Sequence, residues 1–319
     1  MENQSSVKSE DHIRYYFVLL LDILGQKEQL QKWEQLRPDG TVTAQMKEGL
    51  RRSLGQVLNL RKSFFKLFES AESGSQQSVL HQWIALNLQP GSDRDRYNAL
   101  SVCNPKLLHF SDMLVAYSPA AAGPANDWNI MALYRMLGAV CNLLPSFLAL
   151  GIPIRGGICI GIGVEADDLG FYGPALAEVH LLESKVADYP RVVVSQALRD
   201  FIRSKPPENR GPADQYIRLG FELCQSMIAD DPDGWTVVDC LGAGSRKLLS
   251  DNNVLAQAQR QAVAKAGEFV AAERQRLTVA AAAGPSEVMA KLAVRYEHLQ
   301  HYFDSRRRVW TDDTSTGLS

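Results

Sequence analysis

The chain has 319 residues, enough for one large domain or two ordinary ones, and its apolar share of 45% and charged share of 22% are those of a soluble globular protein. This composition excludes a fibrous chain and a wholly disordered one. Because 34 basic residues nearly balance 36 acidic ones, the net charge of −2 gives no general attraction to nucleic acid or to an anionic membrane, and we expect neither as a partner.

Two further features concern the compartment of the protein. The five cysteines are odd in number and form no CxxC pair, which favours reduced thiols over a disulfide framework or a zinc site. The polar start of the chain lacks the apolar stretch of a signal peptide, and the longest apolar runs are shorter than the roughly 20 residues that a membrane span requires. We therefore expect a cytoplasmic protein.

The N-terminal part begins with a polar segment, 1–13, which we expect to be a flexible tail. The continuous apolar run 15–21 predicts a strand that is buried on both faces and stops at Asp22. The segments that follow are rich in Gln, Glu, Lys, Arg and Leu, which favour helices, and then in Ser, Gln and Pro-Gly, which favour loops. They predict, in order, a helix over 26–36, a helix over 43–72 and a mostly irregular stretch over 73–104.

The middle of the chain opens with a hairpin signal. Two short apolar runs, 107–110 and 113–117, flank Ser111 and Asp112, which places an acid at the predicted bend. A long helix with apolar residues at helical spacing and a Gly-rich strand come next, and Pro174 stands at a favoured first-turn position of another helix. The predicted elements of this part are a helix over 126–149, a strand over 154–164, a helix over 174–187, a strand over 191–195 and a helix over 196–204.

The C-terminal part differs in composition. We expect a strand pair, 214–223 and 235–241, around the turn sequence DDPDG, and then Ala-, Gln- and Glu-rich helices over 251–308 that are interrupted near AAAAGPS. Strands and helices together indicate an α+β fold. The expected organisation is a core domain at 14–205, a C-terminal strand pair with a helical extension at 206–310, and flexible tails at 1–13 and 311–319.

Two acids stand where strands end or turn. Asp22 closes the buried strand and Asp112 lies in the hairpin bend, so both can meet at one edge of a sheet. Carboxylate oxygens suit hard divalent cations, which assist phosphoryl chemistry, and backbone N–H groups of the turn ILGQ at a helix start could hold a phosphate. The alternative is that Asp22 caps the helix and Asp112 only forms the turn.

The order of these pieces resembles a known family. FVLLLDILGQ, HFSDMLVAY, IRGGICIG and YGPALAEVHLLESKVADYPRVVVS follow one another as the motifs of the class III adenylate and guanylate cyclase domain do, over about residues 14–200. The last segment is more similar to the bacterial pyrimidine cyclases of the Pycsar anti-phage system than to purine cyclases.

The resemblance implies a ferredoxin-like βαββαβ core, here with the element order βααββαβαβ, that works as a head-to-tail homodimer. It implies two Mg²⁺ or Mn²⁺ ions held by Asp22, Asp112 and the backbone carbonyl of Ile23. One ion would lower the pKa of the ribose 3′-hydroxyl that attacks the α-phosphorus, and the other would neutralise the leaving pyrophosphate. The substrate-binding residues that we predict are Ile23, Leu24 and Gly25 of the turn after Asp22, Ser111 of the bend, and Arg155.

Three positions depart from the purine-cyclase pattern. Leu108 stands where purine cyclases carry a base-reading Lys, and Ala177 and Leu181 stand where they carry Asn and a transition-state Arg. Neither Ala nor Leu can donate a hydrogen bond to a phosphate oxygen. A pyrimidine substrate, or an arginine from elsewhere in the chain, would account for these changes.

Three basic residues are candidates for the missing arginine. Arg155 precedes a strand of Gly and small apolar residues, where we expect few local contacts for its head group, and its alternative role is a salt bridge at the strand start. Lys185 and Arg191 follow the helix and could equally be solvated surface residues. The glycines within 156–163 are too scattered for a phosphate-binding loop and predict close backbone packing, with the helix 174–187 placed at a dimer interface.

The function predicted in this way is a pyrimidine nucleotide cyclase that converts UTP to 3′,5′-cyclic UMP and pyrophosphate. Within the resembling family the product activates a separate effector in anti-phage defence. The alternatives are a cytidylate cyclase that makes cyclic CMP from CTP, a purine cyclase with altered base contacts, and a catalytically inactive cyclase-like domain that senses nucleotides or dimerises.

Overall fold

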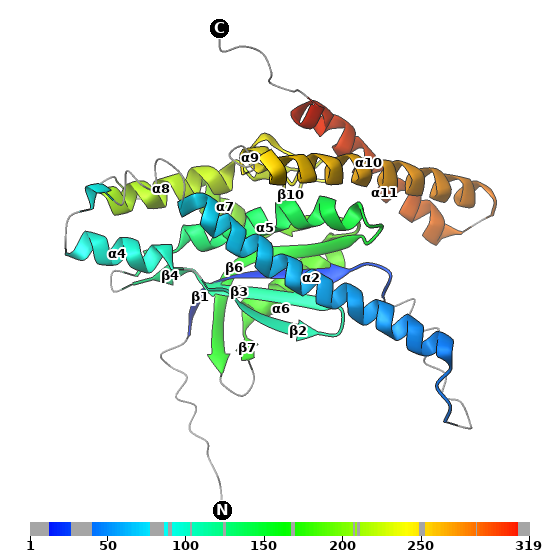
Figure 1. The fold of residues 1–319 in the computed structure, drawn as a ribbon, viewed down its shortest axis with the longest axis horizontal. Helices are drawn as coiled ribbons and strands as arrows, with labels where there is room; N and C mark the ends of the chain where they lie inside the picture. Colours follow the sequence, from blue (N-terminus) through cyan, green and yellow to red (C-terminus); the bar gives the residue numbers. More distant parts are fainter. Residues whose placement is uncertain are drawn as a thin grey trace, which may run out of the picture.

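The computed structural model describes residues 13–26, 40–76, 86–88, 91–102, 104–123, 126–166, 170–206, 208, 211–248, 253–284 and 286–311. In this part of the chain one mixed β-sheet carries helices on both faces (Figure 1). Its strands are β1 (Arg14–Ile23), β2 (Lys106–Phe110), β3 (Met113–Pro119), β6 (Ile154–Ala166), β7 (Gly170–Tyr172), β8 (Val192–Val194), β9 (Ile228–Asp230) and β10 (Thr236–Val238). The short strands β4 (Ala121–Ala122) and β5 (Asp127–Trp128) form a separate pair.

Helices make up most of the remaining described structure. They are α2 (Ala44–Gln76), α4 (Ser92–Ser101), α5 (Ile130–Leu148), α6 (Pro174–Leu181), the one-turn π-helix η2 (Leu182–Val186), α7 (Gln196–Arg203), α8 (Pro212–Gln225), α9 (Ala243–Lys247), α10 (Asn253–Ala282) and α11 (Glu287–Thr311).

The strand order of the sheet is β2-β3-β1-β6-β8-β10-β9, with β7 paired to β6. The first four strands are antiparallel neighbours, because β1 lies between β3 and β6 and runs opposite to both. β8 joins β6 in parallel, after the crossover through α6 and η2, and β10 and β9 complete the sheet in antiparallel fashion. The C-terminal strand pair therefore extends the same sheet rather than forming another.

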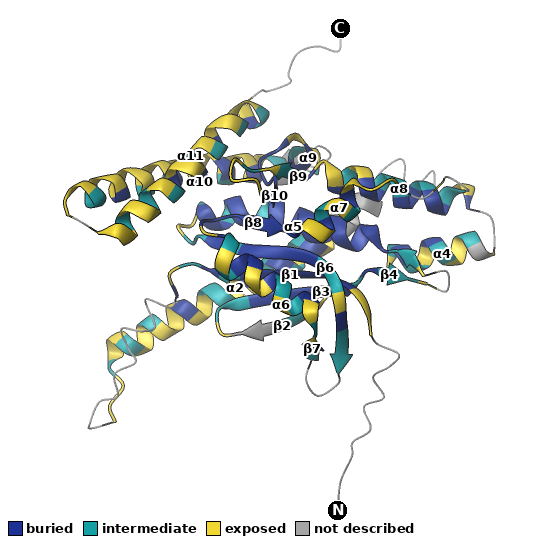
Figure 2. Cartoon of the chain, turned by 180° about the vertical axis from the view of Figure 1, so that it is seen from behind, coloured by how far each residue is buried: buried dark blue, intermediate teal, exposed yellow. Residues whose placement is uncertain are grey.

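The central strand β1 is buried on both faces, as its apolar run predicts. Phe17 and Leu19 belong to the large core on the side of α2 and α5, whereas Tyr16 and Val18 belong to a smaller core under α6. Alternate side chains of a strand point to opposite faces, so a strand covered on both sides must be apolar at every position. Figure 2 shows the buried sheet between the more exposed outer helices.

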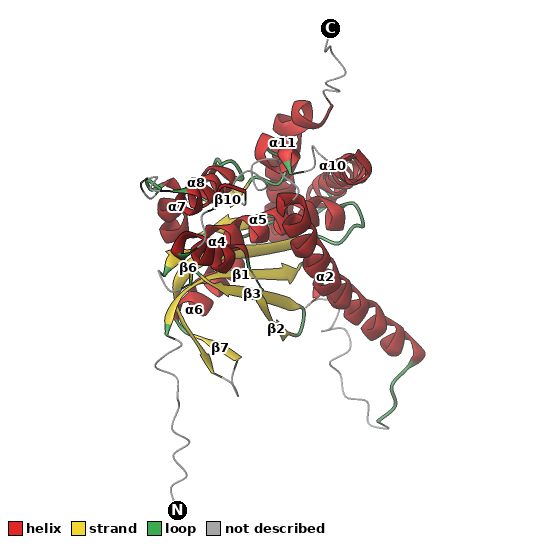
Figure 3. Cartoon of the chain, turned by 60° about the vertical axis from the view of Figure 1, so that its left-hand side comes forward, coloured by secondary structure: helices red, strands yellow, loops and turns green. Residues whose placement is uncertain are grey.

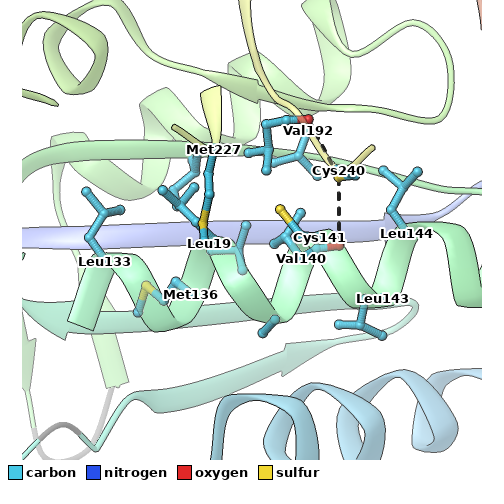
Figure 4. Packing of buried hydrophobic residues seen from close by; sticks show 14 of the residues in the cluster. Leu19, Leu133, Met136, Val140, Cys141, Leu143, Leu144, Val192, Met227 and Cys240 are labelled. Carbon is cyan, nitrogen blue, oxygen red and sulfur yellow. Dashed lines mark hydrogen bonds between the residues drawn. The ribbon is translucent and has the colours of Figure 1, made fainter. Parts of the chain in front are cut away.

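Helix α5 forms the centre of the large core, and α2 and α10 pack against it (Figure 3). Figure 4 shows its side chains interleaved with Leu19 of β1, with Met227 just before β9 and with Cys240 just after β10. Among the described residues α5 is the single helix long and apolar enough to cross a membrane, and 89% of that apolar window is buried inside the protein, as in a core helix.

The close approach of α6 and η2 to the sheet depends on glycine in β6. A Cβ atom on Gly157 would lie 2.7 Å from the Cβ of Leu182, and one on Gly161 would lie 3.1 Å from the Cβ of Ala175. The first distance is shorter than real carbon contacts, and the second is tighter than most of them, so a side chain at either position would push the helix away from the sheet. The predicted close packing is confirmed, and the helix that these two glycines contact belongs to their own chain.

Most predicted elements agree with the structure. The strands at 15–21, 154–164 and 191–195, the hairpin about Ser111 and Asp112, and the helices at 43–72, 126–149, 196–204 and 251–308 are present within a few residues of their expected bounds. The predicted helix over 174–187 is present as α6 followed by η2. Four of the five cysteines are described, and each of these is buried and free, as expected of reduced thiols.

Two predictions are wrong. Residues 214–223 were expected as a strand, but they form most of α8, and the strand that pairs with β10 is β9, nearer the DDPDG turn. The stretch 73–104 was expected to be irregular, but it contains the end of α2 and the whole of α4. The predicted helix 26–36, apart from Gln26, and most of the two predicted tails lie outside the described residues.

Candidate functional site

The sheet brings Asp22 and Asp112 to the same end. Asp22 is the penultimate residue of β1 and pairs with Met113 on β3, and Asp112 directly precedes Met113 in the hairpin bend. On the other side of β1, Asp22 pairs with Arg155 of β6. Strand register alone therefore places the two predicted acids and the predicted arginine together.

Asp22 faces the side of the sheet that α6 and η2 cover. Along β1 it follows Tyr16, Val18 and Leu20 at spacings of two, and these three side chains lie in the smaller core beneath α6. Only 14% of the Asp22 side chain is exposed, so its carboxylate sits at the boundary between that core and solvent. A carboxylate at such a boundary needs partners to remain charged.

The partners come from β6 and η2. Arg155 places Nη2 at 2.6 Å from Oε1 of Glu183 and Nε at 3.5 Å from Oδ2 of Asp22. The short contact is an ion pair rather than an aligned hydrogen bond. Arg155 Nη1 also donates to the carbonyl of Ala187 at 3.4 Å. The expectation of few contacts for the head group of Arg155 is therefore wrong, because the guanidinium contacts two carboxylates and one backbone carbonyl.

The site carries excess negative charge. The pKa of Asp22 is raised from 3.8 to about 7; burial is the largest cause, the charges of Glu183 and Asp112 act in the same direction, and the charge of Arg155 opposes them. A pKa raised by neighbouring carboxylates reports a negative potential that one guanidinium does not neutralise. When Asp22 is ionised, three carboxylates against one arginine leave two negative charges in excess, which a divalent cation would balance.

The donor atoms also suit such a cation. Asp22 and Asp112 present carboxylate oxygens, the ligand type that Mg²⁺ and Mn²⁺ prefer, and the carbonyl of Ile23 remains the predicted third ligand. Among the described residues no group of three His, Cys, Asp or Glu side chains is arranged to hold a metal ion.

The hairpin bend is conformationally unusual. Ser111 has φ of 55°, in the left-handed region, and is exposed, while Asp112 follows it into β3. A two-residue hairpin loop commonly needs a positive φ at its first central position, where glycine costs least. Backbone of this kind in a non-glycine residue is frequent at functional sites.

The turn after β1 only partly supports the predicted phosphate cradle. Gly25 has φ of 86°, as the tight turn requires. The N–H of Leu24, however, donates to the carbonyl of Pro153 at 2.9 Å. Leu24 therefore has no free N–H for a phosphate, which corrects that part of the prediction, and the side chain of Ile23 is buried in the large core.

The other basic candidates lie apart from the acids. Lys185 is exposed on η2. Arg191 is neither a free guanidinium nor a solvated residue, because it is 7% exposed and is held by Asp231, Asp233 and the carbonyl of Val186. The turn sequence DDPDG thus fixes a buried arginine, and only Arg155 of the three candidates reaches Asp22.

The three positions that depart from the purine pattern are placed as follows. Leu108 packs against the smaller core beneath α6. Ala177 and Leu181 are exposed on α6, and 56% of Leu181 is accessible. None of these side chains provides a polar group near the acids.

Sequence reasoning gave no role to Glu183. It is 3% exposed, contacts Arg155 and raises the pKa of Asp22, so it belongs to the site as closely as Asp112 does. The available signal was its position at the end of an apolar helical run, HLLES, in which a buried acid needs a partner.

Two cavities lie away from the acids, one of 290 Å³ around Tyr15, Trp128 and Ile162, the other of 370 Å³ between α10 and α11. The acids lie at the end of the sheet, where 14% of the Asp22 side chain is exposed. No protein-family model matches the sequence, and no curated protein matches it significantly.

Proposed function

We propose that this protein is a nucleotidyl cyclase that forms a cyclic pyrimidine monophosphate, with UTP favoured over CTP. The observation that carries the proposal is the meeting of Asp22, Asp112 and Arg155 at one sheet end with excess negative charge. Two acids beside one arginine are what a cation-bound triphosphate requires: ligands for the cation and a guanidinium for phosphate oxygens.

The topology supports the same proposal. The antiparallel order β2-β3-β1-β6, with α2 between β1 and β2 and α5 between β3 and β6, is the order expected of a βαββαβ ferredoxin-like core. The class III cyclase resemblance predicted that core with the acids after β1 and in the β2–β3 bend. A fold alone does not imply a function, so the weight rests on the site.

In the proposed reaction Asp22 and Asp112 hold the cations, and Arg155 orients the triphosphate. Bound Mg²⁺ or Mn²⁺ would lower the pKa of the ribose 3′-hydroxyl and neutralise the departing pyrophosphate. Arg155 offers a planar, permanently charged donor set that matches phosphate oxygens. Its 22% exposure lets it reach a ligand at the end of the sheet while its other contacts fix its direction.

A second copy of the chain would complete the site. The acids lie at one end of the sheet, and apolar Leu181, 56% exposed, adjoins η2 beside them. A homodimer would cover this end and supply the base contacts. The proposed setting is a cytoplasmic enzyme whose product activates a separate effector in anti-phage defence.

Pyrimidine selectivity follows from the three positions where purine cyclases carry polar residues and this chain does not. Leu108 is apolar, and Ala177 and Leu181 carry no donor, so a purine would lose its expected partners. Unpaired polar groups discriminate substrates by a few kcal/mol, or roughly 100-fold. The same absence favours the second candidate, an inactive nucleotide sensor.

The test is incubation of the purified protein with an equimolar mixture of the four NTPs and Mn²⁺, with products identified by mass spectrometry. We expect cyclic UMP, or cyclic CMP, and its loss in Asp22→Ala and Asp112→Ala. Asp200→Ala, at an exposed acid of α7, is the matched control and should retain full activity. Predominant cyclic AMP or cyclic GMP would overturn the base assignment, and no cyclic product would favour the sensor.

A further inference from the structure

We infer that Glu183 is a positioning residue that keeps the guanidinium of Arg155 off Asp22 and so leaves the Asp22 carboxylate open to a divalent cation. The inference deepens the proposed function and rests on it for the identity of the nucleotide. The contacts of Glu183, Arg155 and Asp22 carry it, and they can be tested without any nucleotide.

A π-helical turn directs the side chain of Glu183 into the protein. The π-helix η2 adds one residue to the turn that continues α6, and the Ala187 N–H closes it on the carbonyl of Leu182. Within this turn Glu183 is 3% exposed, whereas Ser184 is half-buried and Lys185 is exposed. Single π-helical turns are costly and frequently occur at functional sites. Here the turn directs a carboxylate inward, toward β6.

The guanidinium of Arg155 lies closer to Glu183 than to Asp22. Its Nη2 is 2.6 Å from Glu183 and its Nη1 donates to the Ala187 carbonyl, so η2 and the residue after it hold one side of the guanidinium. Its Nε is 3.5 Å from Asp22, is buried, and has no hydrogen-bond partner among the described residues. The guanidinium is therefore drawn toward Glu183, with an unused donor facing Asp22.

The loss of Glu183 would change these contacts. Asp22 is then the nearest carboxylate, and an Arg–carboxylate pair tends to become bidentate, with two parallel N–H···O bonds. Such a pair would occupy both oxygens of Asp22 and cancel the charge that attracts the cation. Loss of a group that orients a metal ligand typically costs about 10- to 100-fold in metal affinity.

A different explanation is that Glu183 only adds negative charge near the cation. The variant Glu183→Asp distinguishes the positioning role from the effect of charge alone, because it keeps the negative charge but retracts the carboxylate by about 1.5 Å. Positioning requires reach, so Glu183→Asp should weaken cation binding about as much as Glu183→Gln. If charge alone matters, Glu183→Asp should bind as the unmodified protein does.

The experiment is a calorimetric titration of the full chain with Mn²⁺ in the absence of nucleotide. We expect about 10- to 100-fold weaker binding for Glu183→Gln and Glu183→Asp, and recovery to within about threefold in Arg155→Met/Glu183→Gln, where no guanidinium competes. Glu178→Gln, at a partly buried acid of α6, is the matched control and should bind normally. Thermal unfolding of each variant verifies that it folds.

Crystal structures of the unmodified protein and Glu183→Gln without metal give a readout independent of affinity. We expect Arg155 Nε and one Nη within hydrogen-bond distance of Asp22 in the variant only. Normal Mn²⁺ binding by Glu183→Asp, an unmoved Arg155, or no Mn²⁺ binding by the unmodified protein would each overturn the inference. Weakened binding and a moved Arg155 without any cyclase activity would retain it and refute the proposed function instead.

Discussion

Replacing Asp22 by asparagine should stabilise the folded protein above neutral pH while it abolishes cation-dependent activity. Burial, and next the charges of Glu183 and Asp112, raise the pKa of Asp22 from 3.8 to about 7 in the folded state. The folded state therefore holds the protonated acid better than the unfolded chain does. Asparagine has nearly the same shape, carries no charge, and can donate a hydrogen bond to Glu183.

The magnitude follows from the two pKa values. Each difference of one in pKa corresponds to 1.36 kcal/mol, so a change from 3.8 to about 7 makes the ionised Asp22 cost about 4 kcal/mol in the folded state. The cost is absent below pH 3.8, where both states are protonated, grows between pH 3.8 and 7, and is complete above. Because the buried amide of asparagine is itself incompletely paired, we expect a net gain of about 2–4 kcal/mol at pH 8.

Urea unfolding of both proteins at pH 5 and pH 8, with EDTA present, measures this gain. The excess stability of Asp22→Asn should be at least twice as large at pH 8 as at pH 5. In a second measurement, with Mn²⁺ in place of EDTA, the metal should stabilise the unmodified protein and leave the stability of the variant unchanged, because only the unmodified protein binds it. An equal difference at the two pH values, or a variant less stable at pH 8, would refute the electrostatic account of the site.

Three further outcomes are expected from other parts of the structure. Arg191→Met should lower the free energy of unfolding by about 3–5 kcal/mol, because it leaves the carboxylate of Asp231, 11% exposed, without the guanidinium that neutralises it; a loss below 1 kcal/mol in urea unfolding would contradict this. Gly157→Ala should destabilise by about 1–3 kcal/mol, because its Cβ would lie 2.7 Å from that of Leu182, whereas the control Gly55→Ala, in open space on α2, should stabilise by roughly 0.5–1 kcal/mol in the same assay. Ser111→Gly should raise the melting temperature by relieving a left-handed φ of 55° worth about 1 kcal/mol, and an unchanged melting temperature would show that the bend carries no such strain.

Local pattern was enough for much of the fold. The apolar run of β1, the paired runs around Ser111 and the helical spacing of α5 each predict their element, because burial on both faces, a tight turn and an amphipathic core helix leave signals within a few residues. The same local signals put Asp22 and Asp112 at strand ends, and strand register then brought them together.

The prediction of a strand over 214–223 is wrong because it relied on residue types rather than on the spacing of the apolar residues. Residues 214–223 contain aromatic and β-branched side chains, which favour a strand. The buried positions, however, include Tyr216, Ile217, Gly220, Phe221 and Cys224, which recur at helical spacing after Pro212 in the first turn. The spacing, rather than the residue types, decided the element.

The sequence by itself determined the central strands, the core helix α5 and the strand-end positions of the two acids, whereas the tertiary structure decided which charged groups meet. Arg191 is fixed by two acids about 40 residues away, and Glu183 reaches Arg155 only because η2 turns it inward. Likewise, Gly157 and Gly161 predict that another segment packs closely against β6, but only the folded chain shows that this segment is α6 and η2 of the same chain. The physical reason is range: propensity and periodicity act between near neighbours in the chain, whereas ion pairing and close packing depend on distances in space that only the folded sheet sets.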